Sequence, residues 1–302
     1  MESELLKKIE KIKAVLPVDK ILNGENNSVR AIKRYYRINH FAYKKFHSDQ
    51  GFMHFRISPS GKIEPSDVFY QPNVISSYIP KDAKVVELGS GQNANICYLA
   101  KKHPDSSFTG YDLKPVKLPK NAPKNIKIIR GDYGDMRDIP SGTVDLVYGI
   151  ETIVHCSDKE KVFSEVYRIL KPNGKFIVYD YATEKPFLKC LPYEQTAIDL
   201  ISKCGASARI ESDEEWENHL VKCGFKLIST TDFAKQTIPD LKRLKKIASK
   251  VIDDDKRLKF VFKFLPRALT NNIIIAYLGE DVCREDLFYY NEWIYERKED
   301  IK

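Results

Sequence analysis

The sequence lacks the features that mark secreted, metal-stapled and membrane-spanning proteins. Its six cysteines are scattered and form no C-x-x-C pair, which disfavours a zinc site or a disulfide framework and fits a reducing compartment. No run approaches the roughly 18 apolar residues that a transmembrane helix needs. The first residues also lack the basic and apolar segments of a secretory signal. We therefore expect a cytoplasmic protein.

Basic residues are in excess, and they are concentrated in two segments. The 302 residues carry 50 basic and 42 acidic side chains, a net charge of +8. Residues 1–50 hold 11 basic against 6 acidic side chains, and residues 234–270 hold 11 against 4. Such segments could meet anionic lipid, a phosphorylated substrate or nucleic acid, and they could equally be solvated faces of two helices.

Short apolar segments alternate with helix-length spacers from residue 82 onward, as in a parallel sheet covered by helices on both faces. The expected strands are 85–88, 108–112, 126–129, 144–148, 176–180, 225–229 and 273–278. We predict an α/β fold with a doubly wound, seven-stranded, Rossmann-like sheet, a helical N-terminal cap and a helical insert before the last strand. The expected parts are a cap over 1–80, the sheet domain over 81–232 and 271–280, the insert over 233–270 and a tail over 281–302.

A glycine turn follows the first expected strand and opens a helix, the setting of a nucleotide-binding loop. Glycines there let the backbone approach a ligand closely, and the helix N-terminus offers free N–H donors. The turn reads Glu87-Leu88-Gly89-Ser90-Gly91-Gln92-Asn93-Ala94. Asp112 stands 21 residues after Gly91, where a carboxylate can accept hydrogen bonds from both hydroxyls of a ribose. By itself the turn fits both NAD and S-adenosylmethionine.

Three further features favour S-adenosylmethionine. Glu87 precedes the first glycine by two residues, and an acid there suits a cationic amino group better than a pyrophosphate. Gly131-Asp132-Tyr133 follows the third expected strand, where a carboxylate can accept from an adenine amino group and a ring can pack on the base. The fourth strand runs into Tyr148-Gly149-Ile150-Glu151-Thr152-Ile153-Val154-His155, which places polar groups at the mouth of the sheet.

The segment from Val85 to Asp180 carries these features in order along the chain. It thereby resembles the class I S-adenosylmethionine-dependent methyltransferases, and among them the C-methyltransferases of sterol side chains. The similar segments are Tyr148–Cys156, Arg168–Phe176 (R-I-L-K-P-N-G-K-F), Asn218–Ile228, Tyr35-Tyr36 and Gly51–Phe55. The resemblance covers roughly residues 33–232 and implies S-adenosylmethionine as the cofactor. The usual third glycine of the turn is Asn93 here, which tolerates a left-handed backbone almost as well.

The turn, the strand ends and the resemblance together indicate the site residues. The expected cofactor-binding residues are Tyr35, Glu87, Gly89, Ser90, Gly91, Asp112, Leu113, Gly131, Asp132, Tyr133, Gly149 and Ile150. Tyr36, Glu151 and His155 are the expected catalytic residues. No metal site is expected: His40, His47 and His54 are seven apart, but Gly51 interrupts a shared helical face.

The acceptor decides the chemistry. An alkene becomes a carbocation after methylation, which the rings of Tyr35, Tyr36 and Tyr43 could stabilise before Glu151 or His155 removes a proton. An oxygen or nitrogen acceptor would need only one base, and His155 could serve. The same aromatic residues could instead be core packing, and Glu151 could be a carboxylate favoured by a helix dipole.

Two regions depart from the sterol methyltransferases: the insert at 234–270 and the tail from Asp281. The insert ends in Lys259–Arg267, where cationic and bulky apolar side chains interleave, as in segments that lie at a membrane surface or in a lid over the site. The aromatic tail could complete an apolar acceptor pocket. Peripheral contact with an anionic membrane is therefore one hypothesis.

We expect a methyltransferase acting on a small, lipophilic acceptor, with C-methylation of an isoprenoid or sterol-like alkene favoured. An O- or N-methyltransferase of a small polar or phenolic metabolite is the nearest alternative, and an NAD-dependent oxidoreductase is a remote one. Nucleic acid is disfavoured as a partner, because the [DN]-P-P-[YFW] run of base-flipping amino-methyltransferases is absent.

Overall fold

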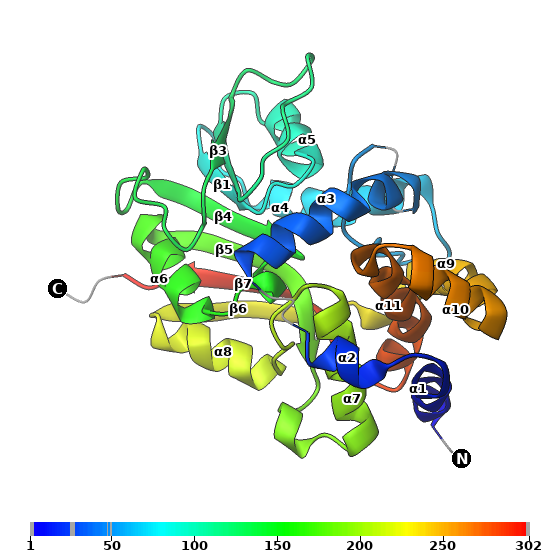
Figure 1. Ribbon diagram of the computed structural model, residues 1–302. Helices are drawn as coiled ribbons and strands as arrows, with labels where there is room; N and C mark the ends of the chain where they lie inside the picture. The colour runs from blue at the N-terminus through cyan, green and yellow to red at the C-terminus, as the bar shows by residue number, and fades with distance from the viewer. Residues whose placement is uncertain (1–2, 25–27, 47, 49, 300–302) are drawn as a thin grey trace.

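The computed structural model describes residues 3–24, 28–46, 48 and 50–299, which build one mixed sheet covered by helices (Figure 1). The strands are β1 Lys84–Leu88, β2 Ser107–Asp112, β3 Ile126–Arg130, β4 Val144–Ile150, β5 Leu170–Thr183, β6 Phe225–Asp232 and β7 Phe288–Arg297. Their order across the sheet is β3-β2-β1-β4-β5-β7-β6. β1 to β5 pair in parallel, and β7 runs antiparallel to both of its neighbours. The predicted seven-stranded α/β fold is confirmed.

Helices lie on both faces of the sheet and extend beyond its carboxyl edge. They are α1 Glu4–Val15, α2 Val18–Leu22, α3 Val29–Phe46, α4 Tyr70–Ser77, α5 Ala94–Lys102, α6 Lys159–Ile169, α7 Pro192–Cys204, α8 Asp213–Lys222, α9 Ala234–Ile252, α10 Asp255–Phe264 and α11 Arg267–Arg284. Three short 3-10 turns are η1 Pro65–Phe69, η2 Ile153–His155 and η3 Phe187–Lys189. None of the described helices is long and apolar enough to cross a bilayer.

Alternating side chains of the strands feed two separate cores, because successive residues of a strand point to opposite faces. Val85 belongs to the core with α5, α7, α9 and α11, and Val86 to the core with α6 and α8. Both faces of the sheet are thus buried, as the apolar strand sequences require. The second core includes Trp216 stacked on Trp293, with ring centroids 4.7 Å apart.

One predicted strand is wrong. Residues 273–278 lie inside α11, which is buried at Ile274, Tyr277 and Leu278. A short apolar run fits a buried helix as well as a buried strand, and periodicity alone does not separate them. The last strand is β7, within the segment 281–302 that we expected to be a tail outside the sheet. The helical insert before the last strand is confirmed, but it runs from α9 through α11.

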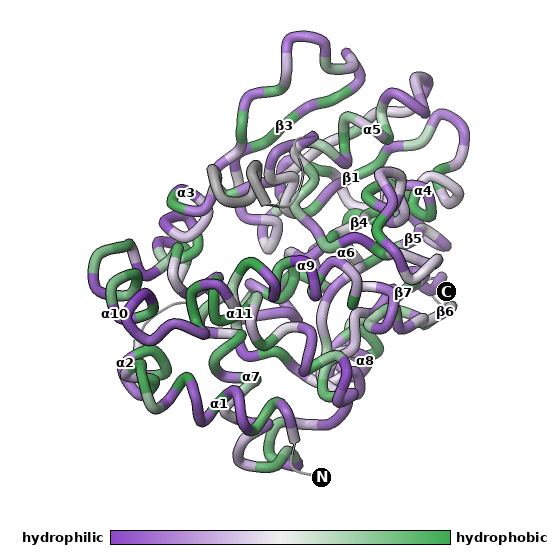
Figure 2. The backbone as a smooth tube through the Cα atoms, turned by 90° about the vertical axis from the view of Figure 1, so that its right-hand side faces the viewer, coloured by the Kyte–Doolittle hydropathy of each residue, from purple (hydrophilic) through white to green (hydrophobic). Residues whose placement is uncertain are grey.

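The helical insert and the N-terminal helices lie beside each other. Figures 1 and 2 show α3 and α10 on one side of the molecule and α8 on the opposite side. α1 is tied to the insert by an ion pair between Lys8 and Asp281, both buried. Lys245 of α9 joins the same group through Asp281 and Glu280. α1 is therefore anchored on α11 directly and on Lys245 of α9 through the shared Asp281.

Candidate active site

A cavity of about 1030 Å³ opens at the carboxyl ends of β1, β2 and β4 and continues to α9 and α11. Ligands of open α/β sheets bind at this edge, where the strand order reverses. The sequence-predicted residues that line it are Tyr35, Tyr36, Gly89, Ser90, Gly91, Asp112, Leu113, Asp132, Tyr133, Ile150, Glu151 and His155. The structure thus gathers twelve predicted residues from five separate segments on one cavity.

The glycine turn between β1 and α5 has the left-handed backbone that its sequence indicates. Gly89 has φ of 67°, Gly91 of 50° and Asn93 of 63°. A Cβ at Gly89 would lie 2.1 Å from Thr152 Oγ1, so only glycine lets the turn pack there. Asn93 is held by its side-chain amide, which donates to the carbonyl of Val116 at 2.9 Å. The N-terminus of α5 follows this turn and therefore lies next to the cavity.

Asp112 ties the end of β2 to the glycine turn. Its Oδ2 accepts from the backbone N–H of Gly91 at 3.0 Å and its Oδ1 from that of Lys114 at 2.7 Å. Burial raises the pKa of Asp112, and the two backbone hydrogen bonds oppose that shift. Each oxygen keeps a lone pair, so the carboxylate can accept two further hydrogen bonds from a diol.

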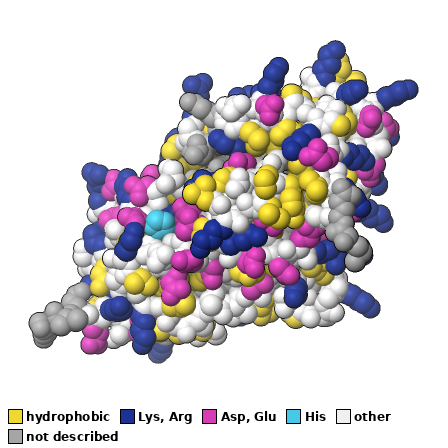
Figure 3. All heavy atoms as spheres, turned by 90° about the horizontal axis from the view of Figure 1, so that it is seen from below, with side chains coloured by type: hydrophobic (Ala, Val, Ile, Leu, Met, Phe, Trp, Pro, Cys, Tyr) yellow, Lys and Arg dark blue, Asp and Glu magenta, His cyan; other side chains and the backbone are white. Residues whose placement is uncertain are grey.

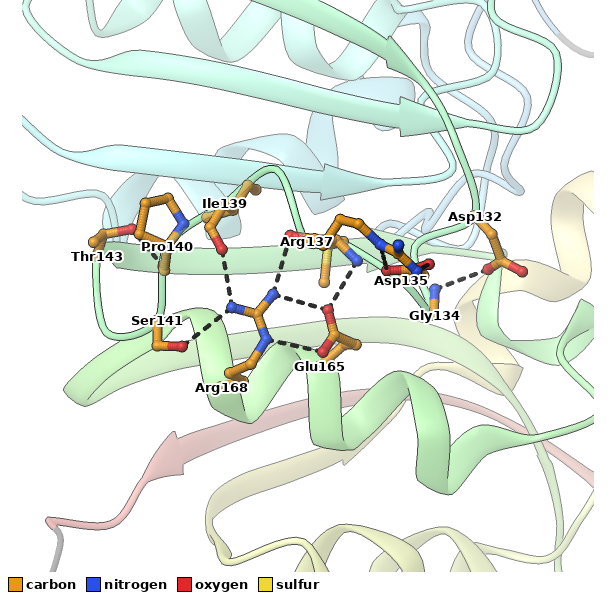
Figure 4. Close-up of polar contacts among 11 residues, drawn as sticks. Asp132, Gly134, Asp135, Arg137, Ile139, Pro140, Ser141, Thr143, Glu165 and Arg168 are labelled. Atoms are coloured by element: carbon orange, nitrogen blue, oxygen red, sulfur yellow. Dashed lines mark hydrogen bonds and ion pairs between the residues drawn. The ribbon is translucent and has the colours of Figure 1, made fainter.

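Asp132 and Tyr133 occupy the loop after β3. Asp132 is exposed and accepts from the backbone N–H of Gly134 at 2.8 Å, whereas Tyr133 is buried and donates to the carbonyl of Thr152 at 2.9 Å. Figure 4 shows the guanidinium of Arg168 bridging the next residues of this loop, with bonds to the carbonyls of Met136 and Ile139. This bridge holds the loop against α6, while Asp132 points away from it (Figure 4).

Three predicted cofactor residues do not line the cavity: Glu87, Gly131 and Gly149. Glu87 is buried behind the turn, and burial raises its pKa to about 8 against the opposing effect of Tyr148 and Asn95. The two glycines serve packing. A Cβ at Gly131 would meet the Tyr111 ring at 3.3 Å, and one at Gly149 would meet Thr152 at 3.0 Å.

The residues around the turn fit the ribose and amino-acid parts of S-adenosylmethionine. Ser90 Oγ is buried and has no hydrogen-bond partner among the described residues. A buried hydroxyl is normally hydrogen-bonded, so this one calls for a polar ligand. Ser90 and Gly91 both line the cavity, so a ligand in the cavity can reach this hydroxyl. The backbone N–H groups at the N-terminus of α5, the Asp112 carboxylate and the Ser90 hydroxyl beside the cavity together suit a polar, hydroxylated cofactor.

Tyr36 and His155 form a hydrogen-bonded pair on the cavity wall. The Tyr36 hydroxyl lies 2.6 Å from His155 Nε2, and His155 Nδ1 lies 3.1 Å from the carbonyl of Ala206. A carbonyl only accepts, so Nδ1 carries the proton and Nε2 accepts from Tyr36. Burial lowers the pKa of His155, which keeps the ring neutral. The pair can therefore take up a proton through Nε2.

Glu151 lies at the end of β4 with a strained backbone, at φ of 48°. Its Oε1 accepts from the backbone N–H of Phe55 at 2.7 Å and from the Tyr290 hydroxyl at 2.9 Å. Burial raises the pKa of Glu151 to about 8 despite these two hydrogen bonds. A carboxyl with such a pKa can hold or release a proton near neutral pH.

Tyr35 joins α3 to the helical insert. Its hydroxyl donates to the Asn272 side chain of α11, and its ring meets that of Tyr36 edge-on with centroids 5.3 Å apart. The side chain of Tyr43, the third expected cage residue, lies outside the described residues, as do those of His40 and His47. In the part of the chain that the structure describes, no group of three or more His, Cys, Asp or Glu could hold a metal ion.

The far end of the cavity is apolar. The lining residues that α9, α10, α11 and β7 contribute are Leu241, Leu244, Ile247, Ala248, Val251, Val261, Leu265, Leu269, Asn272, Ile273, Ile275, Ala276, Gly279, Val282, Cys283 and Phe288. None of these carries a charge, and Asn272 is bonded to Tyr35. Such a wall accommodates hydrocarbon and excludes an ionised group.

Three positions of the candidate site are not among the residues that the sequence predicts: Thr152, Ala206 and Asn95. Thr152 underlies the glycine turn and holds Tyr133, and it stands inside the segment already singled out after β4. Ala206 fixes the His155 tautomer through its backbone carbonyl. Any residue type would supply that carbonyl, so the sequence does not indicate this role. Asn95 lines the cavity and lies 3.2 Å from His54 Nε2. Asn95 is a polar residue in the first turn of the helix that follows the glycines, and this position in the sequence could have indicated a site residue.

This sheet order and this cavity define the fold of the class I methyltransferases, and the comparisons with known proteins agree. Residues 86–178 match the family described as a methyltransferase domain. The sterol 24-C-methyltransferase of Pneumocystis carinii is 27% identical over 168 residues, which cover 51% of this chain and 43% of that protein. The chain thus spans under half the length of the curated relative it matches.

Solved structures share the fold at low identity. The geranyl diphosphate C-methyltransferase of Streptomyces coelicolor superposes with a TM-score of 0.64 at 13% identity, covering 87% of this chain and 97% of its own. The [4+2]-cyclase SpnF superposes at 0.71 and 12%, covering 90% and 97%. Residues 86–178 thus match a methyltransferase domain, the chain is similar to sterol C-methyltransferases, and its fold is that of the class I methyltransferases. The comparisons support the predicted enzyme class and cofactor, and they do not favour NAD.

Proposed function

We propose that this chain transfers a methyl group from S-adenosylmethionine to a small lipophilic acceptor, with carbon methylation of an isoprenoid or sterol-like alkene favoured. The observation that carries the proposal is the uncharged wall which α9, α10, α11 and β7 contribute to the far end of the cavity. A wholly polar metabolite would leave this wall in contact with water or with unpaired polar groups. The match to sterol 24-C-methyltransferases supports the same acceptor class.

The protein's own residues would orient the reactants and handle a proton. S-adenosylmethionine supplies an electrophilic methyl group on a sulfonium. Asp112 and the turn at Gly89–Gly91 would hold its polar parts, and alignment with the acceptor would provide much of the acceleration. The rings of Tyr35 and Tyr36 would face a cation that develops on the acceptor.

Two groups are placed to accept the proton that an alkylated alkene loses. Glu151 reaches the cavity with a pKa of about 8. Alternatively, Tyr36 Oη would take the proton while passing its own to His155 Nε2, and His155 would become an imidazolium whose Nδ1–H stays on the Ala206 carbonyl. An O- or N-methyltransferase would need only the second route, but the apolar wall does not favour its polar acceptor.

Label partition tests this proposal. Purified protein is mixed with methyl-labelled S-adenosylmethionine and a total extract of the source cells, and the product is split between organic and aqueous phases. Label in the organic phase supports a lipophilic acceptor, and its mass identifies the product. Label confined to the aqueous phase would overturn the lipophilic acceptor and favour the polar one.

Peripheral contact with an anionic membrane surface is the second part of the proposal. A lipophilic acceptor partitions into lipid, so an enzyme with a buried apolar cavity gains from working next to a bilayer.

A further inference from the structure

α10 has two apolar faces, and only one is used inside the protein. Leu258, Val261 and Phe262 point inward: Leu258 is fully buried, and Val261 lines the cavity. Phe260 and Phe264 are 61% and 62% exposed, with their rings 4.8 Å apart. A helix that only covers a core needs a single apolar stripe. The outward pair is therefore not explained by the fold.

Cations surround this exposed aromatic pair. Lys259 and Lys263 lie on the same outward side of α10, and Arg267 begins α11 one turn further on. The acids of this region, Asp253–Asp255, lie at the other end of the helix from Phe264, where Asp254 caps it. Bulky apolar side chains ringed by cations match the interface of an anionic bilayer, which takes both the rings and the charges.

A second cationic surface lies on the same side of the molecule. Residues 29–46 of α3 contain no acid, and Arg30, Arg34 and Arg37 are exposed. In Figure 2 α3 and α10 both lie on the left, and in Figure 1 α3 crosses the middle of the view while α10 lies at its right-hand edge. By contrast, Figure 3 shows Lys and Arg interspersed with Asp and Glu over the face seen from below. One side thus presents cations from two helices.

The exposed surface of α10 is continuous with the cavity. Leu265 directly follows Phe264, is 42% exposed, and lines the cavity together with Val261 and Leu269. An acceptor molecule that leaves a bilayer at Phe264 would contact Leu265 and then the apolar wall of the cavity without crossing water. We propose that α10 docks on an anionic lipid surface through Phe260 and Phe264, and that its inner side admits the acceptor to the cavity. The second half of this inference rests on the proposed lipophilic acceptor.

Vesicle binding tests the docking surface without any turnover. The full-length protein is mixed with phosphatidylcholine vesicles, with or without phosphatidylserine, and the bound fraction is measured by flotation at low and high salt. We expect binding to the phosphatidylserine vesicles that salt weakens, and at least a tenfold loss of binding in a variant with Phe260→Ser and Phe264→Ser. Val221→Ser is the matched control, since Val221 is 49% exposed on α8 on the opposite side.

The outcomes separate docking from the proposed function. Absence of vesicle binding by the wild type would overturn the docking surface. Equal binding by the wild type and the Phe260/Phe264 variant would also overturn it, because it would show that the protein binds the vesicles by charge alone, as it would bind any polyanion. Methyl transfer to detergent-dispersed lipid extract without vesicle binding would overturn the proposed membrane contact and leave the proposed methyl transfer to a lipophilic acceptor standing. Vesicle binding without transfer to any lipid would overturn the proposed function and leave the docking supported.

Admission of the acceptor has its own readout. The lipid extract is incorporated into the phosphatidylserine vesicles, and label transfer is compared with transfer to the same extract in detergent. The Phe260/Phe264 variant should lose at least tenfold of its rate on vesicles and keep the wild-type rate in detergent. Equal losses in both would show that the two rings act on folding or on the cavity itself, and would overturn the coupling.

Discussion

The two ends of the cavity are built in different ways. At one end, backbone N–H groups, a left-handed turn and the carboxylate of Asp112 meet at the ends of parallel strands. At the other end, three helices and β7 supply side chains without charge. The strand end depends on backbone geometry and fixes orientation, whereas the helical end depends on volume and selects by size and polarity. The two should therefore respond to mutation independently.

The residues between the two ends should have the largest effect on turnover. His155→Ala removes the group that takes a proton from Tyr36, and we expect a loss of about 10² or more in kcat with unchanged cofactor affinity. Tyr36→Phe should lower kcat similarly, and the double variant should be no worse than either single one, because both belong to one relay. Steady-state kinetics and calorimetric cofactor titration measure this. His219→Ala, on α8, is the control; lost cofactor binding in His155→Ala would show that the base is misassigned.

At the strand end, Asp112→Ala should weaken S-adenosylmethionine binding at least about tenfold, since it removes the half-buried carboxylate that we propose accepts from the ribose hydroxyls. Isothermal titration gives the affinity. Asp135→Ala changes an exposed carboxylate of the next loop, outside the cavity lining, and should bind as the wild type does. Unchanged affinity in Asp112→Ala would contradict the whole assignment of the cofactor end.

At the helical end, Ala276→Phe should fill acceptor space. We expect a several-fold higher KM for the lipophilic acceptor and unchanged cofactor affinity, because Ala276 lies on α11 among the uncharged side chains of the helical end. Overpacking costs about 1–3 kcal/mol, less than the stability of a typical folded domain. Ala276→Ser, similar in volume, serves as the control. Loss of cofactor binding together with acceptor binding would break the distinction between the two ends.

Glu151 gives the smallest effect, a change in how stability depends on pH. Its pKa is about 8 in the fold against an ordinary 4.5, so the folded state binds more protons than the unfolded state between these values. The free energy of unfolding therefore falls as pH rises through that window. Glu151→Gln, whose amide oxygen can still accept from Phe55 and Tyr290, should flatten this fall in urea titrations. Glu214→Gln changes an exposed side chain and should not alter the pH dependence of the free energy of unfolding. If Glu151→Gln also left this pH dependence unaltered, the raised pKa of Glu151 would be contradicted.

The strand end of the cavity could be predicted from sequence because its residues follow the strands directly. The glycines, Asp112, Asp132 and Tyr133 each stand at a strand end, and parallel strands bring their ends together whatever the details of packing. Glu87 shows the limit. It lies in β1, is buried and does not line the cavity, and its side-chain partners Asn95 and Tyr148 come from α5 and β4, which the turn itself does not specify.

The acceptor end could not be placed residue by residue. The run at 273–278 reads as a strand by composition, and only contacts with α9 and α7 make it a buried helix. β7 carries large side chains toward both faces, so it lacks the alternation that marks a half-buried strand, and its sequence therefore does not predict a strand. Ala206, which sets the His155 tautomer, acts through a backbone carbonyl that any residue would supply.

The position of β7 between β5 and β6 also orders events during synthesis. β6 pairs with β7 and not with β5, so residues 225–232 have no partner in the sheet until residues 288–297 have left the ribosome. Until then residues 175–183 of β5, which pair with β7 in the complete sheet, present an open edge, the kind of edge that invites pairing with another polypeptide. A nascent chain paused within α9 to α11 is thus the form of this protein that chaperones would have most reason to hold.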